Sequence, residues 1–218
     1  MAGVEHYFSP SPDSRRRTRT VALRLKDVSL DLRTDRGVFS ADRIDPGTLL
    51  LLKHAPLPPP RNAGAAAVGR VLADVGCGYG PIAVTLALRA PDATIWAVDV
   101  NERARDLAVA NLSAAGVTVE GGERARVCAP DEVPEALRFD AVYCNPPVRI
   151  GNKALDELLA QWLDRLRPGG FAVLVMHKHL GADSLVRRLA ASGRAPRRLA
   201  IGGGYRVLQV PAADRVGT

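Results

Sequence analysis

An acidic residue followed by three closely spaced glycines suits a nucleotide-like ligand. Residues 71–75 form a short apolar run that carries Asp74, and the next five residues include Gly76, Gly78 and Gly80. Glycine has no Cβ, so this turn can fold tightly and bring backbone N–H groups close to a ligand. Pro81 follows where the first turn of a helix tolerates a missing N–H. The pattern predicts a buried strand, a glycine loop and a helix.

The residues around this loop narrow the choice of ligand. A dinucleotide fingerprint needs a third glycine where this chain has Pro81. Asp74 can accept from backbone N–H groups of the loop or from a cationic amino-acid moiety. About twenty residues further on, the apolar run 95–98 ends in Asp99, whose carboxylate can take both hydroxyls of a ribose. Pro81 disfavours an NAD-linked oxidoreductase, and the chain also lacks an obvious hydride-transfer pair.

The second informative motif is Asn145-Pro146-Pro147, which follows the apolar run 140–144. Two prolines remove backbone donors and restrict φ, so the Asn145 side chain and the Pro146 carbonyl are held stiffly as two acceptors. Such a pair suits an exocyclic –NH₂ group that donates two hydrogen bonds. Bonding both hydrogens directs the nitrogen lone pair at an electrophile. The alternative for this motif alone is a strand end followed by a turn.

Charge and composition indicate a polyanionic partner and a core built from aliphatic residues. The 218 residues include 30 basic and 23 acidic ones, a net charge of +7, with the densest cluster at Arg15, Arg16, Arg17 and Arg19. A basic surface favours nucleic acid, although coding bias alone can also enrich arginine. No apolar run of about 18 residues is present, and the start has no apolar signal region. Three widely separated cysteines lack metal-ligand spacing. We therefore expect a cytoplasmic protein without a membrane span, metal or disulfide.

The order of the predicted elements indicates the fold class. Residues 1–60 should form an N-terminal elaboration, with strands at 21–25 and 29–33, a third at 38–40 and a short helix from Asp45. From residue 61 to 218, strands are expected at 71–75, 95–98, 117–119, 126–128, 140–144 and 171–176, and helices at 81–89, 101–116, 153–166 and 181–191. A hairpin at 197–210 should close one sheet edge. This predicts an α/β fold with a doubly wound, mostly parallel sheet, whose ligand lies at the carboxyl ends of the strands.

On these motifs the chain resembles the Rossmann-like S-adenosylmethionine-dependent methyltransferases, and more narrowly the small-subunit ribosomal RNA guanine-N2 methyltransferases. The resemblance covers roughly residues 5–210. Besides the glycine loop and Asp99, the segments that carry it are Phe39-Ser40, Asp45-Pro46-Gly47-Thr48-Leu49-Leu50-Leu51, Asn145-Pro146-Pro147-Val148-Arg149-Ile150-Gly151-Asn152-Lys153 and Gly203-Gly204-Tyr205-Arg206-Val207-Leu208.

The resemblance implies S-adenosyl-L-methionine as cofactor, RNA or a ribosomal subunit as partner, no metal, and a role for each of three groups of residues. The catalytic candidates are Asn145, Pro146 and Pro147. The cofactor-binding candidates are Phe39, Thr48, Asp74, Gly76, Cys77, Gly78, Gly80, Asp99, Val100, Asn101, Asp131 and Asn145. The substrate-binding candidates are Val148, Arg149, Lys178 and Arg206.

Two departures from the family pattern bear on the substrate. Many relatives have an aromatic residue after Asn-Pro-Pro that stacks on the flipped base, whereas this chain has Val148. Longer relatives also carry a duplicated N-terminal domain that helps to bind RNA, so either the arginine cluster with the N-terminal strands takes that role or the substrate differs. Rival hypotheses are methylation of a protein glutamine amide, methylation of adenine N6, and a non-catalytic RNA-binding module.

Overall fold

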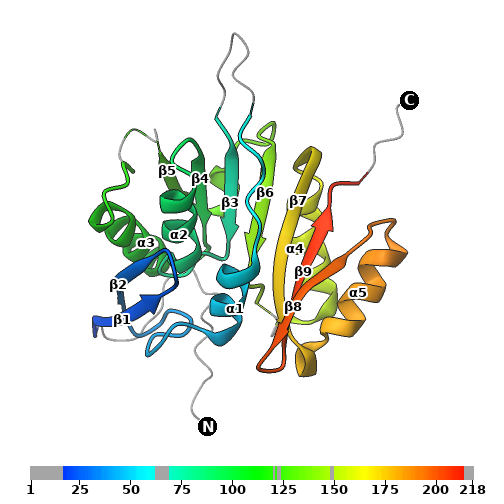
Figure 1. The fold of residues 1–218 in the computed structure, drawn as a ribbon, viewed down its shortest axis with the longest axis horizontal. Coiled ribbons are helices and arrows are strands. Elements are labelled where there is room, and N and C mark those ends of the chain that lie inside the picture. The colour runs from blue at the N-terminus through cyan, green and yellow to red at the C-terminus, as the bar shows by residue number, and fades with distance from the viewer. Residues whose placement is uncertain (1–16, 62–68, 120, 122–123, 148–149, 214–218) are drawn as a thin grey trace.

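The computed structural model describes residues 17–61, 69–119, 121, 124–147 and 150–213. Its centre is a seven-stranded sheet of order β5-β4-β3-β6-β7-β9-β8 (Figure 1). The parallel strands are β3 (Val71–Val75), β4 (Thr94–Val98), β5 (Ala125–Cys128), β6 (Phe139–Cys144) and β7 (Leu166–His177). The hairpin of β8 (Arg197–Gly202) and β9 (Tyr205–Pro211) adds antiparallel strands beyond β7, with β9 next to it. The predicted fold class is confirmed.

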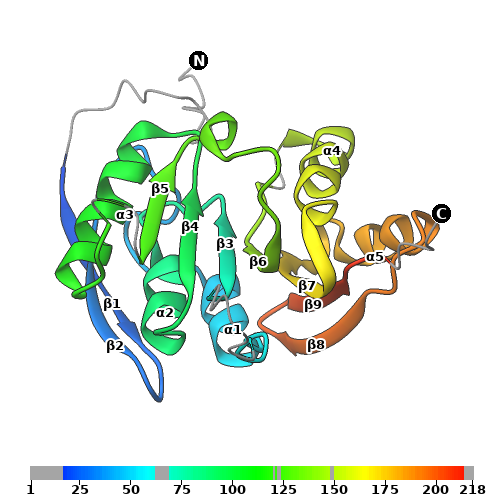
Figure 2. The ribbon, with the colours of Figure 1, turned by 90° about the horizontal axis from the view of Figure 1, so that it is seen from above.

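Helices cover both faces of this sheet because the strand residues alternate between two apolar cores. Leu72 of β3 and Tyr143 of β6 face one core, and their neighbours Ala73 and Val142 face the other. The first core packs against α1 (Pro46–His54), α2 (Pro81–Arg89) and α3 (Glu102–Ala114). The second packs against α4 (Asn152–Leu163) and α5 (Ala182–Ala191). Figure 2 shows α1 and α2 on the opposite side of the sheet from α4.

The N-terminal strands form a separate two-stranded antiparallel sheet, β1 (Arg19–Arg24) and β2 (Ser29–Thr34), that packs beside α3. Its buried residues Leu23 and Leu32 join the first core. The buried side chain of Asn111 in α3 donates to the carbonyls of Arg33 and Tyr79 at 2.8 Å each and accepts from the Arg33 N–H at 2.8 Å. One amide therefore links the hairpin, α3 and the glycine loop. The domain boundary at residue 60 stays a prediction, because residues 62–68 lie outside the described ranges.

Two predicted strands are wrong. Residues 38–40 form turns, and Ser40 has a φ of 56°, a left-handed conformation that a strand cannot contain. Residues 117–119 also lie outside any strand, since β5 already pairs with that edge of β4. There, the Thr118 carbonyl accepts from the Ala125 N–H at 3.0 Å.

The boundary between α4 and β7 also differs from the prediction. The helix ends at Leu163 and the strand begins at Leu166, which pairs with Phe139 before an irregularity in the ladder. Pro168 and Gly169 therefore lie within an irregular strand and do not simply end the helix. In the part of the chain that is described, no helix is long and apolar enough to cross a membrane.

Candidate active site at the carboxyl edge of the sheet

The glycine loop between β3 and α2 leaves open space above the sheet. The N–H groups of Gly76 and Cys77 donate to the Val98 carbonyl at 2.8 and 3.0 Å, which ties the loop to the end of β4. Gly76 and Gly78 have φ values of 71° and 55°, and a Cβ built on either would meet nothing within 4 Å. The backbone is thus accessible to a ligand at both positions.

The third glycine of the loop serves packing. Gly80 has a φ of 88° and precedes α2, and a Cβ there would lie 3.3 Å from the backbone of Ala108 in α3. Its missing side chain therefore lets α2 and α3 approach each other. A direct contact between Gly80 and a cofactor stays a prediction.

Asp74 lies fully buried beneath the loop and caps the helix that follows. Because the N-cap residue Gly80 has no side chain, the Asp74 Oδ2 atom accepts from the Ala83 N–H at 2.9 Å in its place. The other oxygen, Oδ1, is buried with no hydrogen-bond partner among the described residues. Burial raises the pKa of Asp74 to about 8, and the bond from Ala83 opposes that shift. The carboxyl is therefore protonated in the free fold at neutral pH, and a cationic amine near Oδ1 would favour its ionised form.

Asp99, at the end of β4, holds both the loop and the next helix. Its Oδ2 accepts from the Gly78 N–H at 2.8 Å, and its Oδ1 accepts from the Asn101 N–H at 2.9 Å. Burial raises the pKa of Asp99, and the two backbone bonds oppose the rise. A carboxylate oxygen has more than one acceptor site, so each can also take a hydroxyl.

The residues after Asp99 separate into one exposed and one buried side chain. Val100 is exposed. Asn101 is buried, where its side chain accepts from the Ala104 N–H to cap α3 and donates to the Gly37 carbonyl at 2.8 Å. Asn101 thus ties α3 to the N-terminal segment, residues 17–61, through Gly37. The predicted contact of Asn101 with a cofactor stays a prediction.

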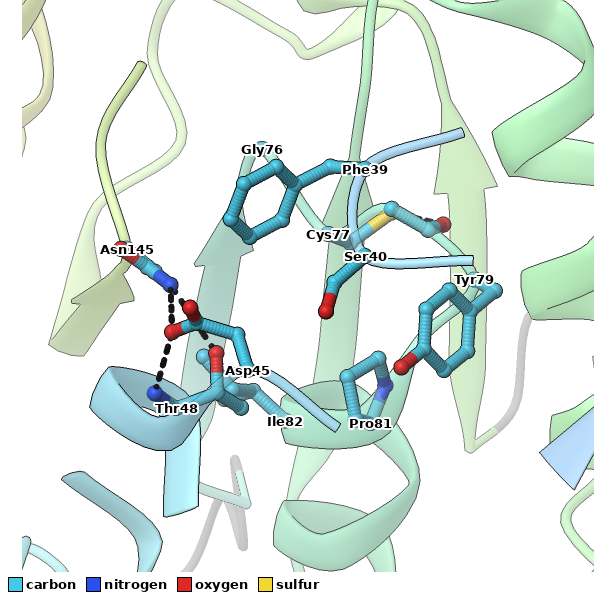
Figure 3. A pocket seen from close by; sticks show the side chains of 11 residues that line it. Phe39, Ser40, Asp45, Thr48, Gly76, Cys77, Tyr79, Pro81, Ile82 and Asn145 are labelled. Carbon is cyan, nitrogen blue, oxygen red and sulfur yellow. Dashed lines mark hydrogen bonds between the residues drawn. The ribbon is translucent and has the colours of Figure 1, made fainter. Parts of the chain in front are cut away.

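Asn145 is held by the N-terminal segment, as Figure 3 shows. Its Nδ2 donates to Asp45 Oδ1 at 2.8 Å and to Thr48 Oγ1 at 3.0 Å. Asp45 is the N-cap of α1, and its Oδ1 also accepts from the Thr48 N–H at 2.9 Å. Neither bond from Asn145 uses its carbonyl oxygen, which therefore remains a free acceptor among the described residues.

A pocket brings these segments together. Its lining comes from the N-terminal segment, the glycine loop, the start of α2 and the Asn-Pro-Pro motif. The lining residues are Phe39, Ser40, Asp45, Thr48, Gly76, Cys77, Gly78, Tyr79, Pro81, Ile82 and Asn145 (Figure 3). Phe39 is 47% exposed, so part of its ring is accessible to solvent. Burial raises the pKa of the Cys77 thiol well above its usual value, so Cys77 is a lining group and not a nucleophile.

Several pocket residues were not among the sequence candidates. Asp45, Ser40 and Tyr79 are the clearest examples. Asp45 lies in a segment that carries the family resemblance and precedes Pro46 at a helix start, but neither signal predicts a contact with Asn145.

The remaining candidates lie away from this pocket or outside the described residues. Asp131 is exposed in a short 3₁₀ turn (Pro130–Glu132) after β5, and Lys178 is exposed in the 3₁₀ turn (Lys178–Leu180) that follows β7. Arg206 of β9 pairs with Asp183 of α5 at 3.0 Å. Val148 and Arg149 are not described. Among the described residues, no group of three or more His, Cys, Asp or Glu side chains could hold a metal.

Comparison with solved structures identifies the class of fold. The Thermus thermophilus 16S rRNA N2 methyltransferase RsmC, solved in complex with AdoMet and guanosine, superposes with a TM-score of 0.66 at 23% identity. The match covers 89% of this chain and 50% of that one. A methyltransferase from Pyrococcus furiosus matches with a TM-score of 0.53 at 18% identity, over 66% of this chain and 75% of that one. The fold is that of the Rossmann-like methyltransferases.

Sequence comparison then identifies the family. The chain belongs to the methyltransferase small domain family, whose model matches residues 29–209. It is 33% identical to the uncharacterised Bacillus subtilis protein YbxB, over 85% of this chain and 87% of that protein. It is 35% identical to the ribosomal RNA large subunit methyltransferase G of Pseudomonas fluorescens, over 76% of this chain and 43% of that protein. Small subunit methyltransferase C of Shewanella loihica is 36% identical, over 66% of this chain and 39% of that protein. The chain thus spans less than half the length of these two ribosomal RNA methyltransferases.

Proposed function

We propose that this protein is an S-adenosylmethionine-dependent methyltransferase that modifies an exocyclic amine, and that the amine is guanine N2 in ribosomal RNA. The observation that carries the proposal is the fixed Asn145 amide in the wall of the pocket, whose two N–H bonds go to Asp45 and Thr48 and leave its carbonyl oxygen without a hydrogen bond among the described residues. An acceptor in that position selects a group that donates hydrogen bonds.

The residues around the loop fit this cofactor. The open space above Gly76 and Gly78 admits a ligand against the backbone. The unpaired Oδ1 of Asp74 offers a buried partner for an amino group. The Asp99 carboxylate is fixed by two backbone N–H groups and can receive the ribose hydroxyls. When bound, S-adenosylmethionine supplies a methyl group activated by a sulfonium sulfur.

The protein's contribution to the reaction is positioning. Asn145 Oδ1 and the Pro146 carbonyl would each accept one N–H of the target amine, which orients the nitrogen lone pair toward the methyl group. Such orientation contributes much of the rate in reactions of this kind and needs no strong base. Asn145 accepts a hydrogen bond and not a proton, so the proton that the amine loses passes to solvent. The buried side chains of Cys77, Tyr79 and Ile82 exclude water from one side of the pocket.

The choice of a nucleobase rests on charge, relatives and one exposed aromatic residue. The net charge of +7 favours an anionic partner. RsmC was solved with guanosine, and the two curated relatives named above act on ribosomal RNA. Phe39, predicted as a cofactor contact, also presents a half-exposed aromatic face in the pocket, where a planar base could stack in the absence of an aromatic residue at position 148. A glutamine side chain would gain less from such a face.

Mass spectrometry of nucleosides from ribosomal RNA, with and without this gene, tests the proposal. We expect N2-methylguanosine to fall by one residue per ribosome in the strain without the gene and to return on complementation with the intact gene. Unchanged ribosomal RNA together with loss of a methylated glutamine would identify a protein substrate. Loss of N6-methyladenosine would identify adenine as the target.

A further inference from the structure

Asp45 occupies a junction between three segments that are far apart in the sequence. It is 9% exposed, caps α1, and takes two N–H bonds on one oxygen, from Thr48 N at 2.9 Å and from Asn145 Nδ2 at 2.8 Å. The Tyr205 hydroxyl, from β9 of the C-terminal hairpin, lies 3.5 Å from the other oxygen. The N-terminal segment, the Asn-Pro-Pro motif and the C-terminal hairpin thus meet at one carboxylate.

Gly47 makes this junction sterically feasible. A Cβ at Gly47 would lie 2.7 Å from the ring of Tyr205 and 2.9 Å from Asp45 Oδ1. Contacts that short do not occur, so a larger residue would displace the tyrosine ring or the carboxylate. Each residue of the run 45–48 therefore has a separate role. Asp45 and Thr48 accept the two N–H bonds of the Asn145 amide. Pro46 begins α1, and Gly47 leaves room for the Tyr205 ring.

The chemistry of the partners decides which end of the Asn145 amide faces them. An asparagine amide has two N–H donors on one side and a carbonyl on the other, and a carboxylate can only accept. Asp45 therefore selects the NH₂ end, and the Thr48 hydroxyl takes the second N–H at 3.0 Å. If the amide flipped, its carbonyl oxygen would face the carboxylate, and Asp45 would lose the N–H of Asn145 and keep only its bonds from Thr48 and Tyr205.

We propose that Asp45 and Thr48 are positioning residues that orient the Asn145 amide, so that its carbonyl oxygen is the only group it offers to the substrate. This inference rests on the proposed function in one respect, that the group received by Asn145 is an amine. It follows that the site accepts hydrogen-bond donors and rejects groups that only accept. Catalysis by Asn145 at the end of β6 then depends on Asp45, which precedes it in the sequence by 100 residues.

Paired substitutions separate this role from helix capping. Asp45→Ser keeps a side-chain oxygen that can cap α1 but is too short to reach Asn145, whereas Asp45→Asn keeps an oxygen at the bonded position. We expect Asp45→Ser to lower kcat about tenfold to a hundredfold, and Asp45→Asn to lower it by less than about fivefold. Thr48→Ser should recover most of the activity that Thr48→Val loses. Asp42→Asn removes an exposed carboxylate of the same segment and serves as the control.

A double-mutant cycle and cofactor affinity distinguish positioning from general damage. In an Asn145→Ala background, Asp45→Ser should add less than about a twofold loss of kcat, because the oriented amide is already gone. S-adenosylhomocysteine affinity should change by less than about threefold in Asp45→Ser. Equal losses in both backgrounds, or the same kcat in Asp45→Ser and the wild type, would overturn the proposal.

One readout is independent of the substrate and therefore of the proposed function. In ¹⁵N-edited NMR spectra, the side-chain amide signal of Asn145 is assigned by its loss in Asn145→Ala. Both amide protons should exchange slowly in the wild type, and one should exchange faster in Thr48→Val. Fast exchange of both in the wild type would disprove the orienting pair even if the enzyme methylates guanine. Slow exchange would support the pair even if the methylated group proved to be another amine.

Discussion

The buried carboxyl of Asp74 makes folding stability depend on pH in a direction that the structure determines. Burial raises its folded-state pKa to about 8, while in the unfolded chain it should titrate near the usual value of about 3.9. Between these values the folded protein holds a proton that the unfolded chain has released. Stability from this group is therefore fully present below the unfolded-state pKa and is lost as the pH rises through about 8.

The loss of folding stability with pH can be calculated from the two pKa values of Asp74. One proton held only by the folded state lowers the free energy of unfolding by about 1.4 kcal/mol per pH unit. From pH 6 to pH 8, as the group itself begins to ionise, the loss should total about 2 kcal/mol. Asp74→Asn has no titrating group but keeps a carbonyl for the Ala83 N–H, so it should lack this slope.

Urea unfolding of both proteins at pH 6, 7 and 8 measures the difference. The fluorescence of the buried residues Trp96 and Trp162 reports the transition. Other titrating groups are common to the two proteins, so the wild-type curve minus the variant curve isolates Asp74. The same pH dependence in both would mean that Asp74 is ionised in the free fold, and the account of the unpaired Oδ1 would fail.

Three further predictions follow from the loop and the N-terminus. Asp99→Ala should weaken S-adenosylhomocysteine binding by about 1.5–3 kcal/mol in calorimetry, with the exposed Glu157→Ala as control; equal affinities would remove Asp99 from the cofactor site. Gly80→Ala should destabilise the fold by about 1–3 kcal/mol more than Gly116→Ala in urea, because both have positive φ but only Gly80 faces a helix; equal losses would contradict that packing role. Replacing residues 15–17 with serine should reduce the slope of log RNA affinity against log salt by about 2 units, at about 0.7 per phosphate contact, whereas an unchanged slope would exclude those arginines.

Helices and strands that begin or end at glycine or proline could mostly be predicted from the sequence. The strand before Gly76, the helix from Pro81 and the hairpin around Gly203 lie where glycine and proline mark turns. The two wrong strands were runs of only three residues, although a glycine precedes each of them, Gly37 and Gly116. Whether a run of three residues becomes a strand depends on a partner edge, and for residues 117–119 β5 already occupies that edge.

The site was less accessible to sequence reasoning because its key contacts are long-range. The sequence places Asp45 at a helix start and Asn145 at a strand end, and neither position reveals that the two side chains are bonded. In the same way, Gly80 looks identical to Gly76 and Gly78 in the motif, but its neighbour in space is α3. The residue types in the glycine loop and the Asn-Pro-Pro motif predicted methyl transfer to an amine. Only the tertiary contacts assign positioning to Asp45 and helix packing to Gly80.

The most direct test of the central claim is methyl transfer by the purified protein in vitro. Ribosomal RNA lacking the modification is incubated with S-adenosylmethionine carrying a deuterated methyl group, and the digested nucleosides are analysed by mass spectrometry. We predict labelled N2-methylguanosine with the wild-type protein and at least about a hundredfold slower labelling with Asn145→Ala, although both bind S-adenosylhomocysteine with similar affinity. Label on a ring carbon or a ribose oxygen, or wild-type labelling by Asn145→Ala, would contradict an amine held by Asn145.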